Sequence, residues 1–441
     1  MKTTPPDILE PKIPVVPAGW AVLPFEQAAD VISDQGKRVK QGSYLPAGKI
    51  PVIDQGQPTI GGYTDDENMA FDDELPVILF GDHTRSLKYV DKRFAVGAEG
   101  VKILRPREGY VPKFFYYLLR SLQIPSRGYS RHFQFLRKFH LPLAPAEQQK
   151  NIVAEIEKQF SRLDEAVANL KRVKANLKRY KAAVLKAAVE GKLTEDWRKE
   201  HPDVEPASKL LERILAERRA TWKGRGKYKE PAEPGMTNLP KLPKGWVWAT
   251  IAQIADVASG NTPSGVLGAV RLAGEIPWFK VGDMNHDENQ HVMRHADAWL
   301  SAAEVRGLGL RLFQPNTVLF PKRGGAIATN KKRRLESPGC ADLNVMGITP
   351  AHNIAAFFFT WFDCVDLGRL SDGSNVPQIN HKDIEPLVVP LPPIGEQQVI
   401  VGEVERRLSV IDELEAAIQD NLTRADRLRQ SILSQAFSGG L

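Results

Sequence analysis

Two stretches of the chain carry apolar residues at intervals of three, four and seven, with charged residues between them. Such spacing lines the apolar side chains along one side of an α-helix and is typical of a coiled-coil seam. We therefore predict two long helices, at 145–193 and 393–441, that pair with each other. The seam residues are Ile156, Leu163, Val167, Leu170, Leu177 and Val184 in the first helix, and Val404, Leu408, Ile411, Ile418, Leu422 and Ile432 in the second.

The charges on these stretches favour a pairing of the two different helices. Residues 146–193 hold eleven Lys or Arg against six Asp or Glu, whereas residues 394–441 hold five against eight. A basic helix and an acidic helix attract each other, which favours an internal pair over association of like copies. Lys174, Lys181, Glu415 and Arg429 fall on the predicted seam, where polar residues usually fix the register. The pattern itself permits both antiparallel and parallel pairing.

The chain also repeats itself. Residues 16–31 return at 242–257, and the blocks 141–157 and 184–193 return at 389–405 and 432–441. A repeat dictates the architecture, so we predict two domains that each lead into one helix. The predicted order is an N-terminal tail (1–15), a first domain (16–144), a helix (145–193), a charged linker (194–240), a second domain (241–392) and a helix (393–441). The linker contains one helical-looking stretch, 207–222, and otherwise gives the chain slack to return.

Each predicted domain mixes short β-branched or aromatic runs with Gly and Pro, as at 75–81 and 316–320. We interpret both as mixed α/β domains with much strand. The predicted fold class is therefore α+β, with two tandem mixed domains and a long helix after each. Trp20 and Trp246 open the two copies in apolar surroundings, and we expect them to anchor the cores rather than to contact a ligand.

Composition narrows the function classes. A chain of 441 residues with 42% hydrophobic and 26% charged residues has the balance of a globular protein with more than one core. No apolar run reaches the about 20 residues that cross a bilayer, and no apolar signal core begins the chain, so we expect a cytoplasmic protein without a membrane partner. Cys340 and Cys364 are too few for a disulfide framework or a zinc ribbon, and we predict no metal site. The net charge of +7 makes a polyanion a plausible partner.

Both domains carry side chains suited to duplex DNA, which needs Lys and Arg for phosphates and planar polar groups for base edges. In the second domain, six cations fall between residues 322 and 334 around two glycines, and the segment 374–382 offers Asn and Gln that could equally serve caps and turns. The candidates there are Lys322, Arg323, Lys331, Lys332, Arg333, Arg334, Gln378, Asn380 and His381. In the first domain they are Lys37, Arg38, Lys40, Arg85, Lys88, Arg127, Tyr129, Arg131 and His132. We hypothesise that each domain reads one half of a split, asymmetric target, because the two domains differ in length and loops.

The organisation resembles the specificity subunits of Type I restriction-modification systems. The resemblance covers nearly the whole chain and rests on the duplicated Gly-Trp start, the Pro-rich runs into Glu-Gln-Gln (141–149 and 389–398), the stretch 276–283 and the duplicated helix ends. It implies an antiparallel helix pair that docks two copies of a modification subunit, and a motor-nuclease restriction subunit that joins them. S-adenosylmethionine, ATP and Mg are then expected on the partners, and the assembled complex would be a site-specific adenine methyltransferase and ATP-dependent endonuclease of a bacterial or archaeal cytoplasm.

Two other function classes were compared with DNA reading. An enzyme is disfavoured because the chain has no Asn/Asp-Pro-Pro-aromatic loop and no Walker A run. His83, between Asp82 and Thr84, lacks a matching nucleophile or metal set, so we expect a structural role and no catalytic residue in this chain. A tandem-domain scaffold that binds protein or glycan would explain the helices but not the basic loops.

Overall fold

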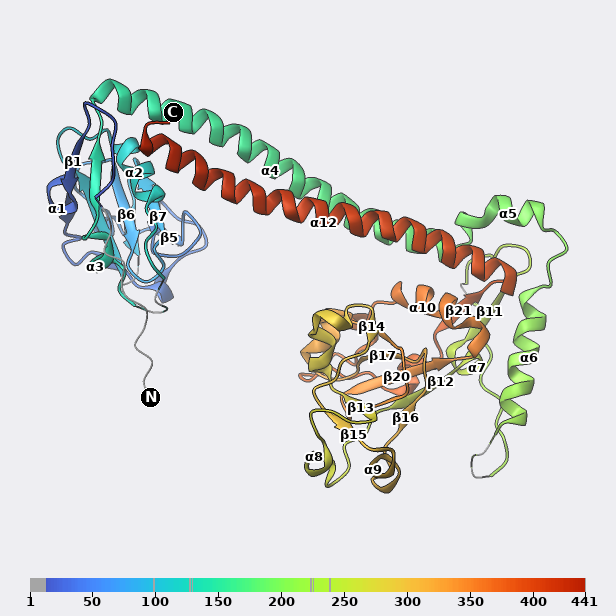
Figure 1. Cartoon of the computed structure of the whole chain (residues 1–441). Helices are drawn as coiled ribbons and strands as arrows, with labels where there is room; N and C mark the ends of the chain where they lie inside the picture. The colour runs from blue at the N-terminus through green and yellow to red at the C-terminus, as the bar shows by residue number, and fades with distance from the viewer. Residues whose placement is uncertain are drawn as a thin grey trace. The chain divides into compact units, whose positions relative to one another are not determined.

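The structure is a computed structural model that describes residues 13–97, 100–126, 128, 130–222, 224, 226–237 and 239–440. The described residues form two compact units (Figure 1). Unit 1 holds the residues up to Val173 and those from Ala417 on, and unit 2 holds Lys174–Ala416. The division runs through both long helices, so each unit combines one domain with a portion of both helices.

Unit 1 is built on two four-stranded sheets and a strand pair. The first sheet is antiparallel and has the order β2 (Ala29–Ile32), β9 (Val101–Pro106), β6 (Val77–Gly81) and β7 (Leu87–Val90). The second has the order β3 (Arg38–Val39), β8 (Ala95–Gly97), β4 (Ile50–Ile53) and β5 (Gly62–Thr64), and β1 (Ala21–Pro24) pairs with β10 (His140–Leu143). Three shorter helices accompany them: α1 (Phe25–Ala28), α2 (Pro112–Ser121) and α3 (Phe133–Leu136).

Unit 2 repeats this plan with one extra strand. Its first sheet has the order β12 (Ala255–Ser259), β20 (Val345–Pro350), β17 (Val318–Pro321), β18 (Arg333–Leu335) and β14 (Val292–Met293). Its second has the order β15 (Trp299–Leu300), β13 (Ile276–Phe279), β19 (Gly339–Ala341) and β16 (Leu312–Phe313), and β11 (Val247–Thr250) pairs with β21 (Val388–Leu391). Its helices include α7 (Ile251–Ile254), α8 (Val266–Ala269), α9 (Ala302–Gly307), α10 (Ala355–Asp363) and α11 (His381–Ile384).

The two units correspond strand by strand, which confirms the predicted tandem mixed domains. In both, four strands of the central sheet pair antiparallel in the same order, and the first strand pairs with the last before the long helix; the extra strand β14 of unit 2 runs parallel to β18. The second sheets differ at one edge. There β3 runs parallel to its neighbour β8, whereas β16 runs antiparallel to β19 and comes from a later part of the chain.

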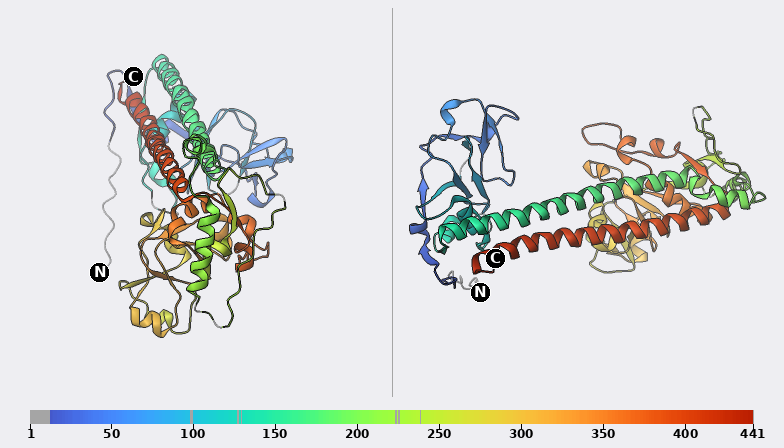
Figure 2. Two further views of the ribbon diagram at one scale, coloured as in Figure 1. Left: turned by 90° about the vertical axis from the view of Figure 1, so that its right-hand side faces the viewer. Right: turned by 90° about the horizontal axis from the view of Figure 1, so that it is seen from above.

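The long helices are α4 (Ala146–Val189) and α12 (Ile394–Ser438), drawn side by side in green and red (Figure 2). In unit 1, Arg429 forms an ion pair with Asp164, and in unit 2 the Lys181 ammonium lies 3.5 Å from the Asp412 carboxylate. In unit 1 the start of α4 packs with the end of α12, and in unit 2 the end of α4 packs with the start of α12. The helices therefore pair antiparallel. Both helices stop before their predicted ends because Gly191 and Gly439 adopt positive φ angles, 72° and 83°, that terminate an α-helix.

The seam of the two helices is visible in the burial of their side chains. All twelve predicted seam residues are buried or half-buried, and the residues between them are mostly exposed. Lys181, Glu415 and Arg429 are half-buried, whereas Lys174 is exposed, contrary to its predicted place on the seam. In an α-helix, positions seven residues apart rotate by about 20° around the helix axis with each heptad. This rotation moves Lys174 from the seam toward the solvent.

The duplicated Gly-Trp and Glu-Gln-Gln motifs hold each domain to the start of its own helix. In unit 1 the Trp20 indole donates a 2.8 Å hydrogen bond to Gln148 at the start of α4. In unit 2 the Trp246 indole donates a 2.8 Å hydrogen bond to the fully buried carboxylate of Glu396 at the start of α12. Trp246 is buried and Trp20 is half-buried, so both tryptophans anchor a helix to a domain.

The linker is packed rather than slack, contrary to our expectation. It contains α5 (Glu195–Glu200) and α6 (Ala207–Ala220), and the buried residues Leu210 and Ile214 of α6 join the core of unit 2. Arg198 and Thr194 both bond to Glu396. The helical-looking stretch 207–222 forms α6, and its apolar residues, spaced four apart, form the buried face. Among the described residues, no helix has the length and apolar character needed to cross a membrane.

Candidate nucleic-acid interface

Unit 1 brings two of the predicted basic stretches into contact. The turn between β6 and β7 contains Asp82, whose backbone carbonyl accepts a 2.7 Å hydrogen bond from the backbone N–H of His132. The Asp82 carboxylate accepts a second bond, 2.8 Å long, from the backbone N–H of Phe133. Arg85 and Arg131 are exposed beside this junction. Segments almost fifty residues apart in the sequence therefore form one surface at the end of the sheet.

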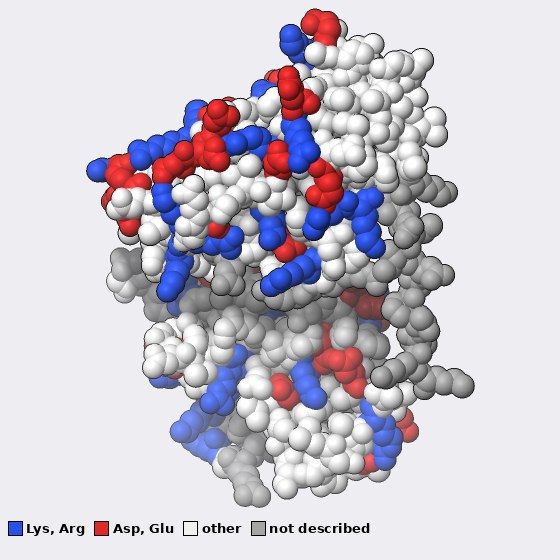
Figure 3. All heavy atoms as spheres, turned by 90° about the vertical axis from the view of Figure 1, so that its left-hand side faces the viewer, with Lys and Arg blue, Asp and Glu red and all other residues white. Residues whose placement is uncertain are grey.

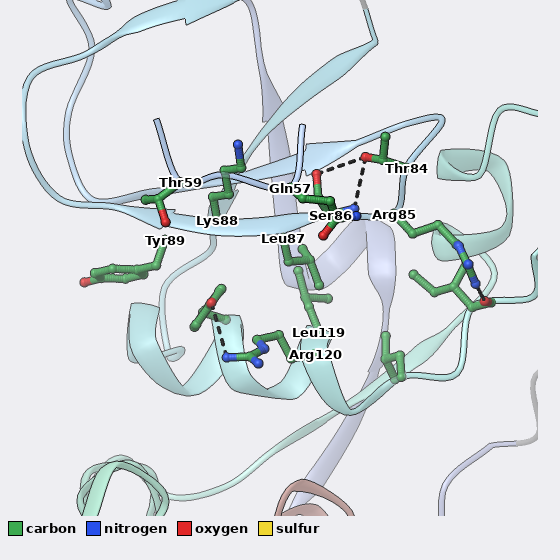
Figure 4. A pocket seen from close by; sticks show the side chains of 13 residues that line it. Gln57, Thr59, Thr84, Arg85, Ser86, Leu87, Lys88, Tyr89, Leu119 and Arg120 are labelled. Carbon is green, nitrogen blue, oxygen red and sulfur yellow. Dashed lines mark hydrogen bonds between the residues drawn. The ribbon is translucent and has the colours of Figure 1, made fainter. Parts of the chain in front are cut away.

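A polar cavity of about 570 Å³ lies beside the same turn (Figure 4). Its walls come from β7, from α2 and from the loop that holds Gln57 and Thr59. Arg120 of α2 donates a 3.4 Å hydrogen bond to the Tyr116 hydroxyl. Guanidinium, amide and hydroxyl groups are the groups that contact phosphates and base edges.

Most of the cavity residues escaped the sequence analysis, among them Gln57, Thr59, Tyr116 and Arg120. Gln57 and Thr59 lie outside any basic stretch, and no local pattern marks them. Tyr116 and Arg120 lie four residues apart in α2, and this spacing, which places two side chains on one face of a helix, was the only available signal.

Several predicted contacts in unit 1 are engaged within the protein. Lys88 is only 7% exposed, its ammonium donates a 2.6 Å hydrogen bond to the Pro58 carbonyl, and burial lowers its pKa. Lys37 and Arg38 pair with the carboxylates of Asp72 and Asp34. His132 is 1% exposed, so it positions the surface instead of reaching DNA. Lys40 is exposed, and Arg127 and Tyr129 lie outside the described residues.

Unit 2 joins the corresponding segments in the same way. The β17–β18 connection and the segment before α11 exchange backbone hydrogen bonds: Gly324 donates to the Pro377 carbonyl at 2.8 Å, and Ile379 donates to the Lys322 carbonyl at 2.9 Å. Arg323 and Gln378 are bridge partners in this junction. An exposed guanidinium and a half-buried amide thus lie next to each other at the site that matches the Asp82–His132 junction of unit 1.

Other polar groups of unit 2 surround this junction. The Lys322 ammonium donates a 2.9 Å hydrogen bond to the Ser259 hydroxyl, and the His381 imidazole lies 3.5 Å from the same hydroxyl. Asn380 stands at the N-terminus of α11 and donates its backbone N–H to the Asp383 carboxylate at 2.8 Å. Lys322, Asn380 and His381 are all half-buried, so part of each side chain remains accessible.

The four consecutive cations at 331–334 divide into structural and accessible residues. Lys332 is 4% exposed and donates a 2.6 Å hydrogen bond to the Val365 carbonyl, and burial lowers its pKa. Burial also lowers the pKa of Arg333, which bonds to a neighbouring carbonyl. Lys331 donates to the Asn285 side chain, and Arg334 is half-buried within β18. The run 331–334 is therefore mostly packed against the protein, although its sequence indicates a solvated basic loop.

Charge is mixed on the face of the molecule that Figure 3 shows, where Lys and Arg side chains alternate with Asp and Glu. Many of the cations of unit 1 take part in such pairs, including Arg93 with Glu67 and Arg107 with Asp30. Net charge alone therefore does not mark the interface. The exposed cations at the two junctions are Arg85, Arg131 and Arg323, and the Arg85 guanidinium also donates a 2.8 Å hydrogen bond to the Ile124 carbonyl.

Two tandem domains with matching polar junctions, anchored to a pair of antiparallel helices, define a class of two-part DNA-recognition protein. The comparisons with known proteins specify this class. The family model described as "Type I restriction modification DNA specificity domain" matches residues 243–424. Over residues 243–424 the chain is therefore similar to the specificity subunits of Type I restriction-modification systems, and curated specificity subunits align with more of it.

Curated relatives align over much of the chain. The Type I restriction enzyme EcoDI specificity subunit of Escherichia coli is 26% identical over 350 residues, which cover 75% of this chain and 70% of that protein. The EcoKI specificity subunit of Escherichia coli (strain K12) is also 26% identical, and the match covers 68% of this chain but only 58% of the relative.

A solved structure extends the likeness of fold to nearly the whole chain. It is described as "Structural basis underlying complex assembly and conformational transition of the type I R-M system". The match covers 97% of this chain and 100% of the chain in that structure, with a TM-score of 0.62 and 17% sequence identity. At that identity the match supports the fold, and the roles of individual residues rest on the geometry described above.

Proposed function

We propose that this chain is the non-catalytic subunit that directs a Type I restriction-modification enzyme to its DNA target. The observation that carries the proposal is the duplicated junction. In each domain, the turn of the central hairpin is hydrogen-bonded to the segment just before the domain's last helix and strand, and exposed arginines lie at the contact. The same local construction occurs twice in one chain, as a reader of a two-part target requires.

The two junctions are unlike in detail, and this supports an asymmetric target. The hairpin connection spans residues 82–86 in the first domain and 322–332 in the second, where it includes the 3-10 helix Gly325–Thr329. Base edges are discriminated by the particular side chains and by their placement. Two domains with different connections are therefore proposed to read two different half-sites.

The long helices are proposed to set the spacing of the half-sites and to dock the modification subunits. A helix of 44 residues is about 66 Å long at about 1.5 Å per residue. In unit 2, Tyr180, Val410 and Leu414 expose nearly half of their surface on these helices. Apolar side chains exposed on a helix favour contact with another protein. Two modification subunits, one for each repeat, are proposed to bind there.

The chemistry is assigned to the partner subunits. S-adenosylmethionine is proposed to bind the modification subunits, and ATP with Mg the restriction subunits, so that the complex methylates adenine or cleaves DNA. The comparisons give no support to the alternative of a scaffold for protein or glycan. A bacterial or archaeal cytoplasm is the compartment where such an enzyme meets DNA.

The decisive experiment is the adenine methylome of cells that carry the system with and without this chain. We expect a single interrupted motif with two different halves, which disappears when the chain is deleted. A continuous or palindromic motif would contradict the two-reader assignment. A salt titration of DNA binding adds an independent check, because phosphate contacts make the affinity fall steeply with salt.

A further inference from the structure

One loop of unit 2 gathers two imidazoles and a carboxylate outside the DNA junction. One ligand atom each from His286, His295 and Asp297 lie within 4.8 Å of one another. The Asp297 oxygen is 3.1 Å from Nε2 of His286 and 3.8 Å from Nε2 of His295. The two imidazole rings are 5.0 Å apart and nearly perpendicular.

The loop that carries this cluster is held by buried polar side chains. Asn289 is fully buried, and its amide nitrogen donates to the backbone carbonyls of Asp283 at 2.8 Å and His295 at 2.6 Å. Its amide oxygen accepts the backbone N–H of His295 at 3.0 Å. Asp283, 2% exposed, accepts the backbone N–H of Asp297 at 3.2 Å. The backbones of His295 and Asp297 are therefore fixed before any ligand binds.

The nitrogen of His286 that faces the cluster lacks a satisfactory partner within the described part of the chain. Nε2 is a buried atom without a hydrogen bond of acceptable geometry, although the carboxylates of Asp297 and Asp283 lie 3.1 and 3.6 Å away and the histidine side chain as a whole is 34% exposed. A buried polar atom without a hydrogen bond costs about 1–3 kcal/mol, so its position needs a reason. A cation bound between the two histidines supplies one.

We propose that His286, His295 and Asp297 bind a divalent transition-metal ion, with Zn²⁺ as the best fit. Two imidazoles and one carboxylate suit Zn²⁺ rather than Mg²⁺ or Ca²⁺, which prefer oxygen ligands. Tetrahedral bonds of about 2.0–2.2 Å separate neighbouring ligand atoms by roughly 3.3–3.5 Å. The two histidine nitrogens lie 3.1 and 3.8 Å from the Asp297 oxygen, on both sides of this range, and within 4.8 Å of each other, so the side chains shift to complete the site. Three protein ligands leave the fourth position for water.

The ion would stiffen the part of unit 2 that supports the cations at 331–334. Strand β14 lies between the two histidines in the sequence and pairs with β18 through Val292 and Arg334. The loop also provides the side-chain oxygen of Asn285 that accepts from Lys331. Any effect of the metal on DNA affinity rests on the proposed function, whereas metal binding itself does not.

The test uses the full chain, stripped of metal by a chelator and titrated with Zn²⁺ or Co²⁺ in the absence of DNA. We expect one ion per chain by calorimetry, and a visible absorption band of four-coordinate cobalt. His286→Ala, His295→Ala and Asp297→Asn should each weaken binding by about tenfold or more, because losing even an outer-shell partner costs about 10–100-fold. Mg²⁺ should not compete.

The matched control is His291→Ala, which removes an exposed histidine of the same loop that lies outside the cluster. It should bind Zn²⁺ like the wild type, and metal-free melting curves should coincide for all four variants. Absence of Zn²⁺ binding by the wild type, or equal binding by wild type and ligand variants, would overturn the proposal. DNA affinity is then measured with and without Zn²⁺, so that loss of DNA binding and loss of metal binding are separate outcomes.

Discussion

At the scale of single residues, the cations of this chain divide by what surrounds them. Arg323 is exposed beside the amide of Gln378, whereas Lys332, a few residues along, is buried and bonded to backbone carbonyls. A guanidinium that remains in water can form bidentate bonds with phosphate or guanine. A buried ammonium instead stabilises the loop that carries the exposed groups.

Arg323→Ala should weaken DNA binding with little effect on folding. Loss of one good arginine contact costs about 1–3 kcal/mol, so the affinity of the assembled complex for its target should fall by about 5–150-fold. Fluorescence anisotropy with a labelled target duplex measures the change. Arg369→Ala removes a highly exposed arginine of the same unit that pairs with Asp366 near the surface, and it should leave the affinity unchanged. Equal losses in both variants would mean that only net charge is being read.

Lys332→Ala should destabilise the protein by about 1–3 kcal/mol at neutral pH, because two backbone carbonyls lose their donor. Urea unfolding measures this, and Lys382→Ala, at an exposed position, should change the stability by no more than about 0.5 kcal/mol. The pKa of Lys332 is lowered by burial from its ordinary value of 10.5, so the unfolded chain binds more protons between the two values. The stability of the wild type relative to Lys332→Met should therefore rise with pH in that window. A flat difference would contradict the burial of this ammonium.

The sequence identified the segments of the interface better than its individual residues. Runs of Lys and Arg marked the regions around 85, 131 and 323. The first two meet each other, and the third meets the Asn- and Gln-bearing segment 374–382. Charge could not distinguish Arg323 from Lys332, because burial depends on the distant helix α10, which supplies Phe362 beneath the ammonium. Gln57 and Arg120 were missed because only folding brings them to one cavity.

At the scale of elements, the long helices were the easiest part to predict. Their seam repeats every three or four residues, so it is encoded locally and needs no knowledge of the rest of the fold. The packed linker was harder, since α6 is short and its apolar face is completed only by residues of unit 2 such as Ala249 and Phe357. The duplicated tryptophans were correctly assigned to anchoring, but their polar partners at the helix starts were not foreseen.

Two neighbouring residues of α12 separate stability from docking. Ile411 is 1% exposed on the seam, and Ile411→Ala should cost about 2–5 kcal/mol in urea unfolding, because it leaves a cavity between the helices. Val410 is 49% exposed, and Val410→Ala should change the stability by less than about 0.5 kcal/mol. The proposed docking surface predicts the reverse order for binding of the modification subunit: Val410→Ala combined with Leu414→Ala should weaken it. Unimpaired assembly of that double variant would move the docking surface elsewhere.

At the scale of the whole molecule, the duplication explains how one chain can read two half-sites. Each domain is held to the start of its helix by an indole hydrogen bond and by a strand pair of the same register type, β1 with β10 and β11 with β21. Each domain thus has an equivalent attachment, while the helices run in opposite directions. The strand pairs are therefore equivalent points at which one domain can replace the other.

Replacing residues 247–391 with residues 21–143 tests this symmetry. The hybrid retains Trp246, Glu396 and both helices, so its attachment and its opposite helix charges are preserved. Two copies of the first domain present the same side chains to DNA, so both should read the first domain's half-site. Cells that carry the hybrid should methylate an interrupted motif in which both halves are the first domain's half-site, with circular dichroism showing that the hybrid folds. A folded hybrid that still directs methylation to two different half-sites would contradict the assignment of one half-site to each domain, and sequence reading would then have to reside in the helices or the linker.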